Sequence, residues 1–323
     1  MSTGTAELPP SAGAPSSRAA LDRVRRYLFA ELGPQRGPAG VGLARPRALF
    51  GALGDPQDRF RAVHVAGTAG KGSVSTFVAS LLRAHGFRVG AHLSPHAYSV
   101  LERFQVDGAP AGADLVDAEL ERIRPAVEAV EQAGHGRPSF FEVTNAIAFG
   151  LFADRVDYGV VETGLGGLLD STNTISRADK LAVITPIGLD HQDVLGATVR
   201  EIAAQKAGVL PVGGRAVAAR QRSAEVEDVL SAEATRRGCD LRWVELGPPR
   251  RCGPGPDRAA PSCTYAASRP CPWGSRGSTR PATPIWRCAP SRRWLRGTDG
   301  PWTRMPSGWG CAAPRCPVGS NAS

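Results

Sequence analysis

The stretch AVHVAGTAGKGS, residues 62–73, decides how the rest of this sequence is interpreted. Its first half is apolar and contains two β-branched valines, which predicts a short buried strand. A glycine-rich turn follows the strand and leads into a helix. One face of that helix is predicted to carry Val74, Phe77, Val78, Leu81 and Leu82. A strand, a glycine-rich turn and a helix in this order are typical of a phosphate-binding loop.

The predicted loop has the residue types that hold a nucleotide and a metal ion. Lys71 can reach a β- or γ-phosphate, and the Ser73 hydroxyl can ligate Mg²⁺. The glycines and the helix N-terminus supply backbone N–H groups for an anion. The common Walker A pattern has Gly where Val65 stands and Ser or Thr where Gly72 stands, so this loop is a variant. The alternative is a glycine-rich turn with an exposed lysine. We expect nucleotide binding by Gly67, Thr68, Gly70, Lys71, Gly72 and Ser73.

Charge and cysteine content differ between the two parts of the chain. The net charge is +9, and the arginines after residue 250 account for all of it. The preceding part is neutral, so the basic composition does not indicate nucleic-acid binding. Cys239 is the one cysteine before residue 250, which favours a reducing, cytoplasmic location. Residues 1–20 lack the apolar region of a signal peptide, and no apolar run has the length of a membrane span.

Apolar strands alternate with helices between residues 17 and 247, which predicts one α/β domain with a parallel sheet covered by helices on both faces. Pro125 is expected to kink or split the helix that contains it. After residue 61 the expected strands are 62–66, 87–93, 102–106, 158–162, 181–185 and 215–219. The expected helices include 44–53, 114–131, 139–154, 199–207 and 224–237, together with an N-terminal helix that carries Leu21, Val24, Leu28 and Leu32.

Three polar residues fall at or just after the carboxyl ends of predicted strands, where ligands bind in such sheets. These are Ser94, Glu162 and His191. Glu162 ends an apolar strand, the place where a nucleotide-hydrolysing enzyme needs a carboxylate for Mg²⁺. Its alternative role is a helix or loop cap. A lone His191 is more often structural, and a lone Lys206 on a helix is more often solvated.

Several motifs occur together in one order along residues 20–245. They are the loop at 67–73, Ser94-Pro95-His96, Glu102-Arg103, Phe140-Phe141-Glu142, Glu162–Gly167, Asp170–Asn173, Ile187–His191 and Lys206–Gly208. This part of the chain resembles the folylpolyglutamate synthase/dihydrofolate synthase family of the Mur ligase superfamily. The resemblance implies ATP-dependent phosphorylation of a carboxylate on a pterin-containing substrate. The amine of L-glutamate then attacks the acyl phosphate and gives an amide, ADP and phosphate.

The resemblance also implies roles for individual residues. Two Mg²⁺ ions are expected, one held by Ser73 and Glu162, the other by Ser94, Glu162 and His191. Lys71, His191 and Lys206 are implied to be catalytic; Lys206 matches a lysine that is carbamylated in relatives. Residues that match the pterin-binding positions are Ser139, Phe141, Asp170 and Ser171. The implied partners are pterin or folate, L-glutamate and ATP, bound by a monomer without nucleic acid or membrane.

Three positions depart from the family pattern. Ala69 stands where the family usually has Asn, Leu168 where it has Arg, and Asn145 where it has Thr or a similar small residue. The first two changes remove polar groups near the phosphates, so the rate of phosphoryl transfer is expected to be affected.

The ends of the chain are expected to be irregular, over residues 1–16 and 248–323. Relatives continue with a second domain that binds glutamate, and nothing after residue 250 resembles it. The late segment is poor in Leu, Ile and Val and rich in Pro and Arg. We interpret it as translated out of frame, and we expect a poor or inactive ligase. The alternatives are a Mur-type ligase for a peptidoglycan precursor and a non-catalytic nucleotide-binding remnant. A zinc module is disfavoured because the segment has no C-x₂-C pair.

Overall fold

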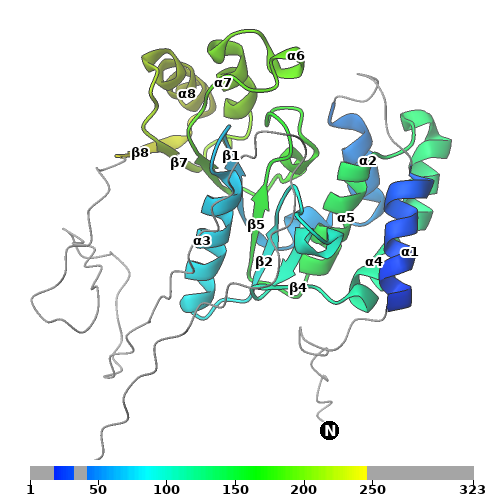
Figure 1. The fold of residues 1–323 in the computed structure, drawn as a ribbon. Helices are drawn as coiled ribbons and strands as arrows, with labels where there is room; N and C mark the ends of the chain where they lie inside the picture. Colours follow the sequence, from blue (N-terminus) through cyan, green and yellow to red (C-terminus); the bar gives the residue numbers. More distant parts are fainter. Residues whose placement is uncertain (1–17, 33–41, 246–323) are drawn as a thin grey trace, which may run out of the picture. The chain divides into compact units, whose positions relative to one another are not determined.

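The computed structural model describes residues 18–32 and 42–245. The irregular segments predicted at residues 1–16 and 248–323 lie outside the described residues. The described part contains an α/β sheet with helices on its faces, as the alternating sequence pattern predicts (Figure 1).

The sheet has eight strands in the order β4-β3-β2-β5-β1-β6-β7-β8. Neighbouring strands are parallel from β2 through to β8, and β3 and β4 add an antiparallel hairpin at one edge. The strand bounds are β1 Arg61–Ala66, β2 Val89–His92, β3 Phe104–Val106, β4 Ala109–Pro110, β5 Tyr158–Glu162, β6 Leu181–Ile184, β7 Arg215–Ala219 and β8 Asp240–Val244. Predicted strands 158–162 and 215–219 are confirmed at both ends, whereas β4 and β8 were not predicted.

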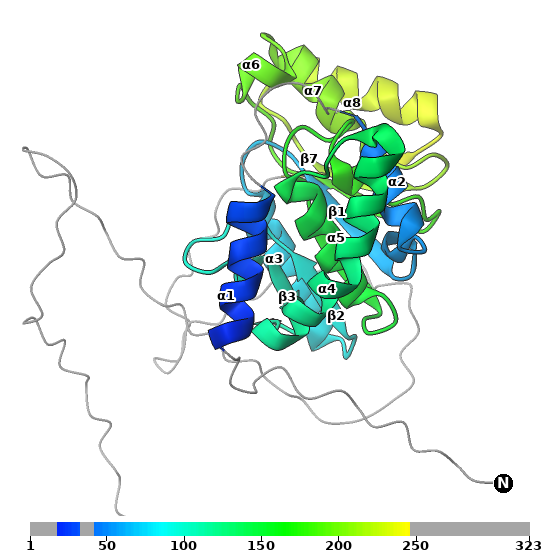
Figure 2. The ribbon, with the colours of Figure 1, turned by 90° about the vertical axis from the view of Figure 1, so that its right-hand side faces the viewer.

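Alternate residues of the central strands face two different helical layers. Ala62 of β1 and Val161 of β5 pack with helices α1, α2, α4 and α5, the layer that faces the viewer in Figure 2. Val63, Val65 and Val160 pack on the opposite face against α3. Because side chains alternate along a strand, an apolar run such as this one is buried on both faces. β6 and β7 contribute to a third cluster with α7 and α8.

The longer helices match most of the predicted ranges. They are α1 Arg18–Arg26, α2 Ala44–Ala52, α3 Lys71–Ala84, α4 Ala113–Val130, α5 Phe140–Phe152, α7 Val199–Ala207 and α8 Ala224–Arg237; α6 is a short turn at Gln192–Leu195. Short helical turns lie at Tyr27–Glu31, Pro56–Asp58, Val100–Arg103, Glu131–His135 and Ser171–Thr174. The described helices include none with the length and apolar character needed to span a membrane.

Three local expectations were wrong. α4 runs unbroken through Pro125, because the buried stripe on its inner face holds the helix against its neighbours. Glu102 lies in a helical turn capped by Ser99 and not in a strand, since its carboxylate accepts hydrogen bonds from three backbone N–H groups. In α3, Phe77 and Leu81 point to solvent, with 67% and 57% of their surface exposed. The other three residues predicted for this face, Val74, Val78 and Leu82, do pack against the sheet, together with the buried Ser75 and Ala79.

Candidate active site

The glycine-rich loop joins β1 to α3 at the carboxyl edge of the sheet. Gly70 has a left-handed backbone, with φ of 84°, and caps α3. Gly67 has φ of +148°, and a Cβ atom there would lie 1.9 Å from Thr185 Oγ1. Only glycine fits position 67, because the loop passes directly over the end of β6. This close approach confirms that residues 67–70 form a tight turn between strand and helix.

Thr68 fastens the loop to the segment that follows β6. Its backbone N–H donates to Pro186 O at 3.0 Å, and its hydroxyl donates to Gly188 O at 3.1 Å. The same hydroxyl accepts from Gly188 N–H at 3.2 Å. Ala69 N–H also donates to Pro186 O, at 3.3 Å. The structure therefore uses Thr68 to position the loop, and any contact with a nucleotide stays a prediction.

Glu162 ends β5 and faces the phosphate loop. Its side chain is almost fully buried, and Oε2 accepts a hydrogen bond from Ser94 N–H at 3.0 Å. A Cβ atom on Gly72 would lie 3.5 Å from the same oxygen, so Glu162 reaches the first turn of α3. Burial raises the pKa of Glu162, while Ser94 N–H, Lys71 and Arg103 act in the opposite direction. Among the described residues, no basic side chain forms an ion pair with Glu162.

A buried carboxylate without an ion-pair partner is costly unless a cation neutralises it. The surroundings of Glu162 fit Mg²⁺, because the carboxylate and nearby hydroxyls are the hard oxygen ligands that this ion prefers. Ser73 lies in the first turn of α3, and Ser94 follows β2. Within residues 18–32 and 42–245, no group of three or more His, Cys, Asp and Glu side chains forms a metal site by itself. A metal here would depend on the serine hydroxyls and on a bound phosphate.

Lys206, on α7, reaches the phosphate loop from the opposite side. Its side chain is buried, and Nζ donates to Gly67 O at 2.9 Å. Burial, together with the charge of Lys71, lowers the pKa of Lys206 to about 8. The structure thus brings Lys206 to the predicted nucleotide loop, although the sequence alone favoured a solvated side chain.

His191 occupies a different environment from Glu162. It has a left-handed backbone, with φ of 49°, and precedes the short helix α6. Its side chain is 57% exposed, and Nε2 lies 3.8 Å from Asp190 Oδ2. It forms no hydrogen bond with Ser94 or Glu162. Its proposed role as a metal ligand stays a prediction.

A second feature of the site is a cavity of about 350 Å³ beside Glu162. It is lined by Ser94, Pro95, Arg103, Phe140, Phe141, Gly164, Leu165 and Asp170. Phe141 packs directly over Gly164, where a Cβ atom would lie 2.5 Å from the ring. Flat apolar rings and one buried acid in a cavity suit a flat heterocycle with N–H groups. Two of the four predicted pterin-binding residues, Phe141 and Asp170, therefore lie together.

Ser139, the third predicted pterin-binding residue, has a structural role at the start of α5. Ser139 caps α5: its hydroxyl accepts from Glu142 N–H at 3.2 Å, and Glu142 Oε2 accepts from Ser139 N–H at 2.7 Å. Asp170 also has a structural role, because its carboxylate accepts N–H bonds from Leu165 at 2.8 Å and Thr172 at 2.9 Å. Burial raises the pKa of Asp170, and these hydrogen bonds oppose that shift.

Ser171 belongs to a buried polar chain behind the cavity. Asn145 Nδ2 lies 2.6 Å from Ser171 Oγ, which leaves Asn145 Oδ1 and His92 Nε2 without partners. His92 Nδ1 donates to Arg103 O at 2.9 Å, so Nε2 can only accept. With the amide of Asn145 rotated by 180°, Nδ2 donates to His92 and Oδ1 accepts from Ser171. We assign this orientation because it satisfies both buried atoms.

Sequence reasoning missed two residues of this region. Arg103 lines the cavity, donates to His96 Nδ1 at 2.8 Å and lies over the Phe140 ring at 5.2 Å. His92 is fully buried against Phe104 and Phe141, and burial lowers its pKa to about 4. The motif Glu102-Arg103 was the available signal for Arg103. No periodicity marks His92, since it ends a strand that is buried on both faces.

Comparison with known proteins agrees with this geometry. The chain is 44% identical over 174 residues to a dihydrofolate synthase/folylpolyglutamate synthase of Bacillus subtilis, and 43% identical over 208 residues to that of Mycobacterium tuberculosis. These matches confirm the resemblance to the folylpolyglutamate synthase/dihydrofolate synthase family. The matches cover 53% and 60% of this chain. No family model matches the chain.

Solved structures of that family share the fold. M. tuberculosis folylpolyglutamate synthase complexed with ADP and AMPPCP matches with a TM-score of 0.62 and 38% identity over 70% of this chain. An FPGS–AMPPCP–folate complex matches with a TM-score of 0.62 and 32% identity. The chain spans 40% and 42% of the two curated relatives, and 50% and 53% of the two solved chains.

Proposed function

We propose that the chain binds ATP with Mg²⁺ and takes part in joining L-glutamate to dihydropteroate or folate through an acyl phosphate. The observation that carries this proposal is the buried Glu162 carboxylate, which faces the phosphate loop without an ion-pair partner among the described residues. Relatives named for folate ligation, and solved relatives complexed with ADP or AMPPCP, support the same interpretation.

Different residues of the site would contact the phosphates of the nucleotide and its metal ions. Lys71 would contact the β- and γ-phosphates, and Gly67 and Gly70 hold the loop open to them through their unusual backbone angles. Ser73 and Glu162 would hold one Mg²⁺, and Ser94, Glu162 and His191 would hold the other. When bound, this metal would neutralise charge on the phosphates. Lys206 fixes the Gly67 carbonyl and so positions the turn.

The cavity beside Glu162 would receive the pterin ring. Phe141 would stack on the ring, and the Asp170 carboxylate on the cavity wall would interact with its N–H groups. Arg103, also on the wall, would attract the substrate carboxylate or the acyl phosphate formed from it. Ser94 lies both on this wall and next to Glu162, so the substrate and the nucleotide would meet there.

Two alternatives remain to be separated by experiment. A Mur-type ligase would need a large sugar-nucleotide substrate, whereas the cavity is small and lined by two phenylalanines. A non-catalytic nucleotide-binding protein would keep the phosphate loop and lose turnover. The glutamate site is expected from the resemblance alone, and the described residues supply no group that we assign to it.

The test is ADP release by the full chain with Mg²⁺, L-glutamate and either dihydropteroate or a UDP-muramyl substrate. We expect slow release with dihydropteroate, because the described residues supply no glutamate site, and a further loss of at least about 100-fold in Glu162→Gln, because the amide carries no charge for the metal. Glu225→Gln is the matched control, since Glu225 is half-exposed, pairs with Arg200 and is not one of the predicted site residues. Unchanged Mg²⁺-dependent turnover in Glu162→Gln would contradict the site. Nucleotide binding without substrate-dependent release would favour the non-catalytic alternative.

A further inference from the structure

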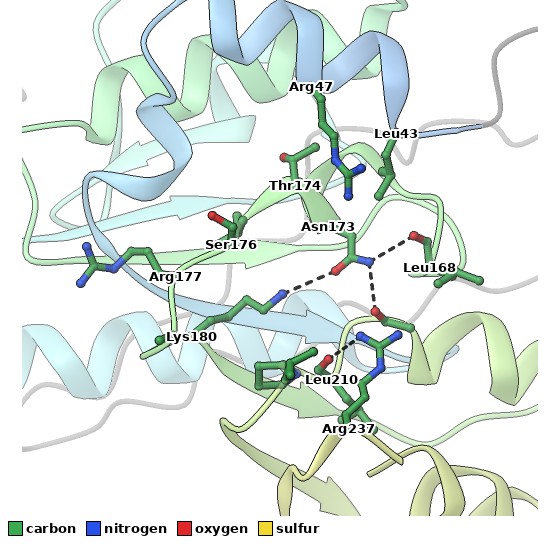
Figure 3. Close-up of a pocket in the computed structure, with 15 residues that line it drawn as sticks. Leu43, Arg47, Leu168, Asn173, Thr174, Ser176, Arg177, Lys180, Leu210 and Arg237 are labelled. Carbon is green, nitrogen blue, oxygen red and sulfur yellow. Dashed lines mark hydrogen bonds between the residues drawn. The ribbon is translucent and has the colours of Figure 1, made fainter. Parts of the chain in front are cut away.

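A second cavity, of about 620 Å³, opens near the amino ends of β6, β7 and β8 (Figure 3). Its wall includes Ala178 and Lys180 just before β6, Val212 shortly before β7 and Arg237 shortly before β8. These positions lie at the amino ends of the strands, whereas the phosphate loop and Glu162 lie at carboxyl ends. None of the predicted nucleotide, metal or pterin residues lines this cavity. It is therefore a site separate from the one described above.

Lys180 is the central charge of this cavity. Only 6% of its surface is exposed, and Nζ has one recorded acceptor, Asn173 Oδ1, at 3.5 Å. Asn173 is itself held in place, because its Nδ2 donates to Leu168 O at 3.1 Å and Gly208 O at 3.0 Å (Figure 3). No carboxylate of the described residues forms an ion pair with Lys180. A buried ammonium with one long hydrogen bond lacks the partner that such a group normally has.

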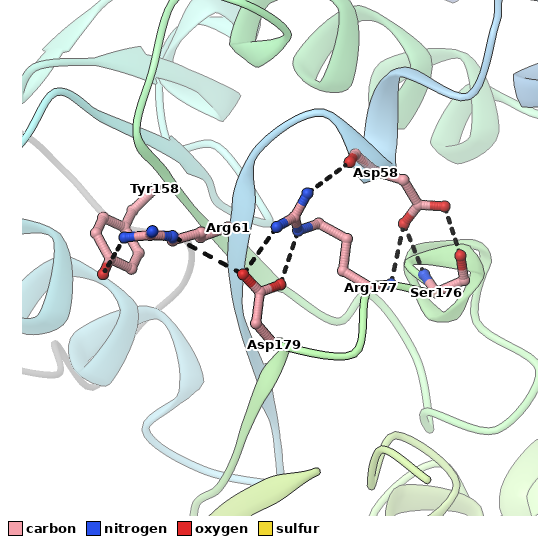
Figure 4. A network of polar contacts seen from close by, with 6 residues as sticks. All are labelled: Asp58, Arg61, Tyr158, Ser176, Arg177 and Asp179. Carbon is pink, nitrogen blue, oxygen red and sulfur yellow. Dashed lines mark hydrogen bonds and ion pairs between the residues drawn. The ribbon is translucent and has the colours of Figure 1, made fainter. Parts of the chain in front are cut away.

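The other cations of the wall differ in how far they are already neutralised. Arg177 is bound by Asp179 through two hydrogen bonds, at 2.7 and 2.8 Å, and donates to Asp58 O at 3.1 Å (Figure 4). Arg237 pairs with Glu233 and donates to Leu210 O at 2.7 Å. Arg47 on α2 has no partner recorded among the described residues. Among the described residues of the wall, Lys180 and Arg47 are thus the two positive charges available to a ligand.

The rest of the wall is largely apolar. Leu43, Leu168, Ile175, Leu210, Pro211 and Val212 lie around the two cations. A cavity of this size, with an apolar wall and a few fixed polar groups, is typical of a small-molecule site. Burial and the charge of Arg237 lower the pKa of Lys180 to about 8, and Asp58 and Cys239 oppose this shift only in part, in keeping with an excess of positive charge around Lys180. An anionic ligand would remove that excess.

We propose that this cavity binds a small organic anion, with its carboxylate or phosphate between Lys180 and Arg47 and its apolar part against Leu168 and Leu210. The site is independent of the proposed ligase reaction, because it shares no lining residue with the nucleotide loop or the pterin cavity. A purely inorganic anion would leave the leucine wall uncovered, so the organic anion should bind more tightly.

The test is isothermal titration of the full chain with phenyl phosphate and with phthalate, an aromatic phosphate and an aromatic dicarboxylate. Inorganic phosphate is the probe without an apolar part. We expect at least one aromatic anion to bind more tightly than inorganic phosphate, and Lys180→Met to weaken that binding at least tenfold. Lys71→Met, which removes the lysine of the phosphate loop, should bind phthalate as wild type does, since phthalate has no phosphate group for that loop.

Folding of Lys180→Met is checked by circular dichroism and thermal unfolding. Arg47→Ala is a second variant at an exposed position, and we expect it to weaken binding severalfold whether or not Lys180→Met folds. The proposal is overturned if neither aromatic anion binds at millimolar concentration or if both cavity variants bind like wild type. Loss of binding in Lys71→Met would also overturn it, since the anion would then occupy the phosphate loop.

Discussion

Two buried lysines lie at opposite ends of the parallel strands of the sheet. Lys206 lies at the carboxyl edge and donates a 2.9 Å hydrogen bond to the Gly67 carbonyl of the phosphate loop. Lys180 lies at the amino edge, and its recorded acceptor, Asn173 Oδ1, is 3.5 Å away. Burial lowers the pKa of both lysines to about 8. The same residue type with the same pKa shift therefore has a structural role at one edge and an incomplete set of partners at the other.

The difference shows that a pKa shift alone does not identify a binding site. Desolvation is the largest cause of both shifts, so the two values cannot distinguish the lysines. Hydrogen-bond geometry does distinguish them, because Lys206 has a short bond to a backbone carbonyl and Lys180 does not. Lys206 therefore positions the loop in this structure, while its implied catalytic role stays a prediction, and Lys180 is the lysine that we propose for an added anion.

The largest expected effect is on the free energy of unfolding, and it compares a glycine at the carboxyl end of the strands with one at the amino end. Gly67→Ala should lower the free energy of unfolding by about 4 kcal/mol, because the new Cβ meets Thr185 and the backbone angle is strained. Gly213, close to β7, also has a positive φ, of +64°, but a Cβ added there would have no atom within 4 Å. Gly213→Ala should therefore cost only about 1 kcal/mol. Urea denaturation measures both, and equal losses would show that the loop is not tightly packed on β6.

The next effect is the pH dependence of stability due to Lys180. Its folded pKa of about 8 lies below the ordinary 10.5, so the unfolded chain binds more protons between these values. The free energy of unfolding should then rise with pH, by at most about 3 kcal/mol between pH 8 and pH 10.5. Lys180→Met should lack this contribution and be relatively more stable below pH 8.

The measurement is urea denaturation of wild type and Lys180→Met at pH 7, 8, 9 and 10. Lys206 is present in both proteins, so its contribution cancels in the difference between them. Cys239 is also present in both, but Lys180 lowers its pKa, so Lys180→Met in a Cys239→Ser background removes that contribution. A difference that does not change with pH would mean that Lys180 has an ordinary pKa.

The smallest expected effect concerns a buried polar group whose partners are complete. Asn145→Leu should cost about 2 kcal/mol, because His92 Nε2 and Ser171 Oγ would lose their partner. Asn145→Thr keeps one hydroxyl and should cost about half as much. Thermal unfolding compares the three proteins. A leucine variant as stable as wild type would contradict the assigned orientation of the amide.

Some features were determined by the sequence because they depend on neighbouring residues. The bounds of β5 and β7 and of α7 and α8 were predicted correctly, since hydrophobic periodicity and caps are local signals. The turn after β1 was also predictable, because only glycine tolerates the backbone that it needs. Placing Ser94, Glu162 and the loop at one edge followed from parallel strand order alone.

Other features were decided by tertiary structure. Phe77 and Leu81 have the right spacing for a buried face, but α3 lies against the sheet through Val74, Ser75, Val78, Ala79 and Leu82. Pro125 is accommodated because packing of α4 outweighs the lost hydrogen bond. The environments of Lys180 and Lys206 could not be read from sequence, since each is set by segments distant along the chain. Burial and hydrogen-bond partners are properties of the whole fold, and they are what separates a scaffold lysine from a binding lysine.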